Sequence, residues 1–177
     1  MTPIKLHAFS ELPAVFHHRQ TWDGFNNPSL VIENTQHKKE LGFKNVNSKK
    51  LLNIFNGSFK IESLKPLSMV YAGHQFGQYV EQLGDGRGLL LGQIDSPDGS
   101  IDIHLKGAGK TPYSRFGDGR AVLRSVIREY LCGEAMHALS IPTSRALMII
   151  GSDEIVIREK SETAAMLART AKTHIRF

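Results

Sequence analysis

Residues 88–106 predict two β-strands joined by a tight turn, which restricts the chain to folds containing an antiparallel sheet. Residues 88–94 form an apolar run bounded by glycines, which is typical of a buried strand. Residues 96–99 read Ser-Pro-Asp-Gly, a turn in which proline presets φ and glycine takes the strained position. Residues 101–106 alternate apolar and polar side chains, as expected of the partner strand.

One long helix and several further strands are predicted around this hairpin. Residues 121–139 carry apolar side chains at helical spacing, and the Ser-Ile-Pro sequence that follows ends the pattern. Strands are predicted at 69–72, 145–151, 154–159 and 164–171, and a loop at 107–119. Residues 1–60 are polar and show no regular pattern, so no helix or strand is predicted there. We therefore expect an α+β fold, an antiparallel sheet with one long helix packed on it.

Composition excludes several classes of protein. Cys132 is the single cysteine, so neither an intrachain disulfide nor a thiolate zinc site can form. No stretch approaches the ~18 consecutive apolar residues of a membrane span, and the first residues lack the apolar core of a secretory signal. We expect a cytoplasmic protein with no membrane partner.

The excess positive charge is concentrated in one segment. Residues 104–128 hold six Lys/Arg and one Asp, so this segment alone carries the +5 excess of the whole chain. A basic block that also contains four glycines indicates an anion-binding site, with a nonspecific basic patch as the alternative. No H-E-x-x-H motif occurs, so no metal site is expected from this chain alone.

Two glycine-containing motifs could bind phosphate. Gly84, Gly86 and Arg87 open the strand 88–94, where alternating glycines allow close backbone approach to a ligand and arginine adds a charged fork; an ordinary glycine-rich turn is the alternative. Asp118 and Gly119 precede the long helix. They could form an anion site at the helix start, or Asp118 could cap the helix.

Four charged residues complete the candidate site. Lys106 ends a strand ahead of Gly-Ala-Gly, and Glu129 borders the buried face of the helix, so a buried ion pair between them is expected. A solvent-exposed lysine, and a surface pair of Glu129 with an arginine of its own helix, are the alternatives. Arg169 and Arg176 lie seven residues apart and could both reach a polyphosphate, or both lie on the surface.

The sequence resembles the selenoprotein O family. The resemblance rests on five runs covering roughly residues 64–177: YAGHQFGQY (71–79), QLGDGRGLLLG (82–92), HLKGAGKTPYSRFGDGRAVLRSVIREYL (104–131), EAMHAL (134–139) and RTAKTHIRF (169–177). Members are protein adenylyltransferases with a protein-kinase-like fold, which transfer AMP from ATP to Ser, Thr or Tyr hydroxyls of proteins and release pyrophosphate. The resemblance implies ATP as ligand, with magnesium or manganese in full-length members.

The resemblance also implies a division of the chain and a set of contacts. Residues 1–60 would be a variable N-terminal segment, and residues 61–177 the nucleotide-binding N-lobe of the kinase-like fold. The family's nucleotide-contacting positions fall on Gly84, Gly86, Arg87, Lys106, Glu129, Asp118, Gly119, Arg169 and Arg176.

Family members continue far beyond this length. Their catalytic aspartate and metal ligands lie in a second lobe that this sequence lacks, so the chain is expected to be an N-terminal piece that is inactive by itself and whose partner is the missing C-terminal lobe. A nucleotide-binding pseudoenzyme and a basic nucleic-acid-binding module are the alternative functions. The second is not expected, because the basic segment has few stacking aromatics and no known reader motif.

Overall fold

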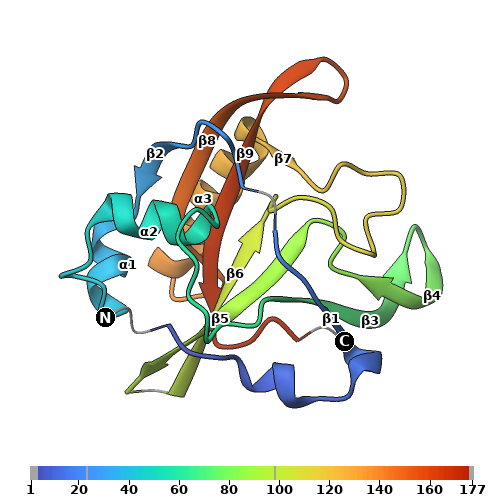
Figure 1. The fold of residues 1–177 in the computed structure, drawn as a ribbon, viewed down its shortest axis with the longest axis horizontal. Helices are drawn as coiled ribbons and strands as arrows, with labels where there is room; N and C mark the ends of the chain where they lie inside the picture. The colour runs from blue at the N-terminus through green and yellow to red at the C-terminus, as the bar shows by residue number, and fades with distance from the viewer. Residues whose placement is uncertain (1–3, 23, 98, 176–177) are drawn as a thin grey trace.

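A mainly antiparallel sheet runs through the molecule (Figure 1). The structure, a computed structural model, describes residues 4–22, 24–97 and 99–175. The strands are β1 (His17–Arg19), β2 (Ser29–Glu33), β3 (Leu67–Gln75), β4 (Gln78–Gly84), β5 (Gly88–Ser96), β6 (Gly99–Lys106), β7 (Ala121–Val122), β8 (Arg145–Ile157) and β9 (Ser161–Ala171). Their order is β1-β3-β5-β6-β9-β8-β2, with β4 paired to β3 and β7 to β9.

The helices are few, as predicted for an α+β fold. Two 3-10 turns, Ala8–Glu11 and Ala14–Phe16, are followed by α1 (Thr35–Glu40), α2 (Ser48–Phe55) and α3 (Leu123–Ala138). In Figure 1, α2 and α3 lie on opposite sides of the β8–β9 part of the sheet. No helix within the described ranges is long and apolar enough to cross a membrane.

The predicted hairpin, loop and long helix are confirmed, whereas strand β4 was not predicted and two further details differ. β5 and β6 pair as expected, with Gly88 opposite Lys106. The strands predicted at 145–151 and 154–159 are one strand, β8, because an irregularity between Gly151 and Ile155 lets the same strand continue along β9. The helix begins at Leu123, since residues 121–122 pair with β9 as the short strand β7.

Residues 1–60 contain elements that the sequence pattern did not predict. β2 pairs with β8 at the edge of the sheet, and α2 buries Leu51, Ile54 and Phe55 in the main core. α2 has only eight residues, too few for a clear helical period. The N-terminal third therefore contributes to the same sheet and core as the rest of the chain.

The two faces of the sheet are covered differently. Ala164, Met166 and Ala168 of β9 pack into the main core with α2, whereas Ala165 and Leu167 pack in a smaller cluster with Val126 of α3. This alternation is the two-residue period of a strand. It determines which charged side chains meet on the α3 side.

Candidate functional site

Strand periodicity places three of the site residues on one face of the sheet. Ile103 and Leu105 of β6 point into the main core, so His104 and Lys106 point to the α3 side. On β9, Arg169 continues the row of Ala165 and Leu167 on that same side. β6 and β9 pair antiparallel with His104 directly opposite Arg169, so the basic side chains converge.

Glu129 of α3 joins two of these cations. Its Oε2 accepts a hydrogen bond from Lys106 Nζ, and its Oε1 accepts one from Arg169 Nη1 at 2.7 Å. The predicted Lys106–Glu129 ion pair is therefore present. Arg124, one of the alternative partners on the same helix, instead pairs with Glu162.

Burial and charge oppose each other in this cluster. The side chains of Lys106 and Glu129 keep only 17% and 24% of their exposure. Burial lowers the pKa of Lys106 below its ordinary value, although Glu129 acts in the opposite direction. Burial alone would raise the pKa of Glu129, but Arg169 and Lys106 together lower it. The carboxylate is thus held ionised between two cations.

The glycine loop 84–88 packs against the turn at residues 111–114. Thr111 Oγ1 donates to the carbonyl of Asp85 at 2.8 Å, and Ser114 Oγ donates to that of Gly86 at 2.5 Å. A Cβ on Gly84 would lie 2.3 Å from the ring of Tyr113, and one on Gly86 would lie 2.7 Å from its carbonyl oxygen. These two glycines are required by loop-to-loop packing, whatever else they contact.

Asp118 does not cap the helix, so that alternative is wrong. The N-cap of α3 is Val122, which makes no side-chain capping bond. Asp118 accepts from the backbone N–H of Arg120 and forms a two-point ion pair with Arg158, at 2.7 and 2.8 Å. The two strand residues of β7 separate this loop from the helix, which places Asp118 out of capping range. Its pKa is lowered, mainly by Arg158.

Gly119 holds this loop in place. Its φ is +71°, and a Cβ there would lie 2.0 Å from the carbonyl oxygen of Gly109. Only glycine fits both requirements. The loop 107–120 is thereby closed on itself, with the Gly109 N–H bonded to the Gly119 carbonyl at 3.2 Å.

These elements enclose a cavity of about 1130 Å³ that is rich in positive charge. Its lining includes six cationic side chains, those of Arg87, Lys106, Arg115, Arg120, Arg158 and Arg169, and two carboxylates, those of Asp85 and Asp118. Arg87 is exposed and forms no ion pair with any residue that the structure describes. The cavity therefore offers a cationic surface to an anion.

Most of the predicted site residues line this one cavity. They are Gly84, Gly86, Arg87, Lys106, Asp118, Gly119 and Arg169. Glu129 lies behind the cavity lining and forms ion pairs with two of the lining residues, Lys106 and Arg169. Arg176 lies outside the described residues.

Three of the six basic residues of the segment 104–128 form ion pairs with acidic residues. Lys106 pairs with Glu129, Arg120 with Glu154, and Arg124 with Glu162. All three acidic partners lie outside the segment, so these ion pairs offset part of its excess positive charge.

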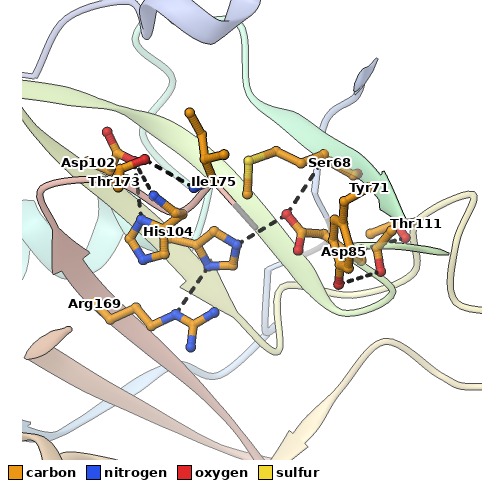
Figure 2. A network of polar contacts seen from close by, with 12 residues as sticks. Ser68, Tyr71, Asp85, Asp102, His104, Thr111, Arg169, Thr173 and Ile175 are labelled. Atoms are coloured by element: carbon orange, nitrogen blue, oxygen red, sulfur yellow. Dashed lines mark hydrogen bonds and ion pairs between the residues drawn. The ribbon is translucent and has the colours of Figure 1, made fainter. Parts of the chain in front are cut away.

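A buried polar network that sequence reasoning missed lies beneath the site (Figure 2). His104 lies between Asp85 of the glycine loop and Arg169 of β9, 3.4 Å from each. Asp102 accepts from the backbone N–H of His174 at 2.8 Å, and the His174 ring stacks on that of His104. The alternation of residues 101–106 already placed His104 on the same face as Lys106, so this signal was available. Arg158 had no such signal, because it lies forty residues from Asp118.

Comparison with known proteins identifies the family. The sequence profile described as Protein adenylyltransferase SelO matches residues 5–177. The chain belongs to the SelO family. This confirms the resemblance seen in the sequence, and the family model and the relatives both carry the names of nucleotidyltransferases.

Relatives of the chain carry the name Protein nucleotidyltransferase YdiU. The protein from Vibrio parahaemolyticus is 53% identical over 172 residues, 97% of this chain and 35% of the relative. Those from Thioalkalivibrio sulfidiphilus and Aeromonas hydrophila are 48% and 56% identical, over 97% and 85% of this chain and 36% and 32% of the relative. The chain thus spans about a third of the length of these SelO relatives.

Proposed function

We propose that this chain binds ATP through its phosphates, as the nucleotide-binding part of a protein adenylyltransferase. The transferase would move AMP from ATP to Ser, Thr or Tyr hydroxyls of proteins and release pyrophosphate. The observation that carries the proposal is the convergence of Arg87, Lys106 and Arg169 at one cavity beside a glycine loop. Each charge-assisted contact to phosphate contributes about 1.5–3 kcal/mol.

In this proposal the carboxylate of Glu129 orients the two central cations. It holds Lys106 and Arg169 from α3, so neither side chain has to be ordered when a phosphate arrives. Arg87 lies on the exposed loop, without an ion-pair partner among the described residues, and would contact the nucleotide from that side. Asp118 and Gly119 also line the cavity, with Asp118 fixed by Arg158.

The same arrangement supports a kinase-like N-lobe as a finer description of residues 61–177. A lysine on a strand, paired with a glutamate on the long helix behind it, is how kinase-like folds position nucleotide phosphates. Lys106 on β6 and Glu129 on α3 have this relationship. The glycine loop precedes β5, the neighbour of the lysine strand in the sheet.

The described residues do not by themselves fit a magnesium or manganese ion. They contain no group of three His, Cys, Asp or Glu side chains able to hold a metal. The carboxylates at the site already contact other groups: Asp85 contacts His104, Asp118 contacts Arg158, and Glu129 contacts Lys106 and Arg169. No step through the metal is therefore assigned to these residues.

For the same reason we propose that this chain alone binds ATP without transferring AMP. Of the two carboxylates that line the described cavity, Asp85 is buried against His104, and the pKa of Asp118 is lowered by Arg158, which makes it a weaker base for an attacking hydroxyl. Incubation with ATP labelled in the α-phosphate, magnesium or manganese, and an acceptor protein should leave both proteins unlabelled. The proposal would be contradicted if the native chain labelled itself or the acceptor protein and the Lys106→Ala variant did not.

Equilibrium binding tests the proposed function. Calorimetric titration with ATP should show one site per chain. Inorganic tripolyphosphate should compete for this site, because the cations of the cavity would contact the phosphates that both ligands share. Random-sequence RNA is the competing ligand. Salt-sensitive RNA binding that ATP does not displace, together with no ATP binding, would favour the nucleic-acid-binding function instead.

A further inference from the structure

The buried imidazole of His104 has no part in the proposed function, yet it contacts two components of the site. Its side chain is only 1% exposed. Nε2 lies 3.4 Å from Asp85 Oδ2 in the glycine loop, and Nδ1 accepts from Arg169 Nε at 3.4 Å. The ring stacks on that of His174, with 4.8 Å between centroids. His104 therefore links the loop to the strand that carries Arg169.

The chemistry of these contacts fixes the tautomer. A guanidinium can only donate, so Nδ1 of His104 must be the unprotonated, accepting nitrogen. Nε2 then carries the proton and donates it to the Asp85 carboxylate. A doubly protonated ring would set an N–H group against the guanidinium of Arg169. Burial first, and Arg169 second, lower the pKa of His104 to about 4, which agrees with a neutral ring.

The glycine loop is shaped to accommodate this ring. A Cβ on Gly88 would lie 2.6 Å from Cε1 and 2.9 Å from Nε2 of His104. Asp85 is fixed in turn, because its Oδ2 also accepts from the Met69 N–H at 3.3 Å. Glycine at 88 is therefore required by the imidazole beneath it.

We propose that His104 is a positioning residue for Arg169. Its Nδ1 holds the Nε edge of the guanidinium while Glu129 holds Nη1, so the plane of the guanidinium is set before a phosphate arrives. Ordering a side chain at binding costs about 0.5–1.5 kcal/mol, so presetting Arg169 raises phosphate affinity by about two- to tenfold. The proposal rests on the proposed function in one respect only, that Arg169 binds phosphate.

Nitrogen NMR of the free chain tests the positioning without any nucleotide. Nδ1 of His104 should have the shift of an unprotonated nitrogen and Nε2 that of a protonated one. The Nε–H of Arg169 should exchange slowly with solvent. His104→Asn keeps an acceptor at the δ position and should preserve the slow exchange. His104→Gln puts a carbon there and should abolish it. A protonated Nδ1, or equally slow exchange in both variants, would overturn the proposal.

A double-mutant cycle on ATP affinity separates positioning from a structural role. His104→Gln should weaken ATP binding by about two- to tenfold in the native chain and have no effect in an Arg169→Ala background. His104→Asn should stay within about twofold of the native chain, as should the exposed control His137→Gln. Equal losses in both backgrounds would mean that His104 only supports the fold. If the native chain binds no ATP, the proposed function fails, and the tautomer and exchange measurements still decide this proposal.

Discussion

Arg169 Nη1 donates to Glu129 Oε1 at 2.7 Å, so a strand and a helix that are forty residues apart share one ion pair. The other oxygen of Glu129 accepts from Lys106. One carboxylate thereby holds two cations that would otherwise repel each other at the edge of the cavity.

Replacing this carboxylate should destabilise the chain. Breaking a fully buried ion pair costs about 3–5 kcal/mol. Because Lys106 and Glu129 stay 17% and 24% exposed, we expect Glu129→Gln to lower the free energy of unfolding by less, about 2 kcal/mol. Urea denaturation measures the change, with the exposed Glu81→Gln as control. An unchanged urea midpoint for Glu129→Gln would show that the pair contributes nothing to folding.

Stability should fall on acidification. The pKa of His104 lies at about 4 in the folded chain against an ordinary 6.5, so the unfolded chain binds more protons between these values. The stabilisation is complete above pH 6.5 and is lost as the pH falls toward 4. Asp102, whose pKa is lowered to about 2 from 3.8, adds a loss below pH 3.8. The groups facing His104 are Asp85, Arg169 and His174.

The measurement for this prediction is urea denaturation at a series of pH values. The free energy of unfolding should rise between pH 4 and 6.5, and His104→Asn should make the rise smaller. Part of the rise should remain, because burial also lowers the pKa of His17 and of His37. A native chain that loses stability as the pH increases from 4 to 6.5 would contradict a lowered pKa for His104 in the folded state.

Two glycines with similar backbone angles should respond differently to alanine. Gly119 has φ +71° and a Cβ position 2.0 Å from the Gly109 carbonyl, whereas Gly42 has φ +77° and open space around it. Gly42→Ala should therefore cost only the left-handed backbone strain, about 1–2 kcal/mol. Gly119→Ala must also move backbone and should cost clearly more. Thermal unfolding compares the two variants; equal losses would mean that the loop 107–120 tolerates the displacement.

The sequence predicted the parts of the fold that local patterns encode. The hairpin at 88–106 and the helix near 121–139 have clear periods, and the Lys106–Glu129 pair followed from the need of a half-buried carboxylate for a partner. Leu131, by contrast, fits the apolar helical spacing but is 63% exposed, because the sheet covers only one narrow side of α3. The spacing of apolar residues shows which face of a helix is buried, but it does not show how wide the surface is that covers this face.

The remaining features depend on contacts between distant segments. The pair of Asp118 with Arg158 requires the β8–β9 hairpin to extend beside the loop 107–120, and nothing near Asp118 in sequence indicates this. The same holds for Gly84, whose missing side chain makes room for Tyr113. Local propensity contains no information about such pairs, so the sequence around Asp118 indicates a helix cap as readily as a partner for a distant arginine.

The most direct test of the central claim, that the cationic cavity binds nucleotide phosphate, is calorimetric titration of ATP into the chain and its variants. Lys106→Ala and Arg87→Ala should each weaken binding about tenfold or more. The exposed controls Lys39→Ala and Arg128→Ala should stay within about twofold of the native chain. Arg87 forms no ion pair with the described residues, so its variant should keep the native fold. ATP affinity that is equal in all four variants and the native chain would contradict phosphate binding at this cavity.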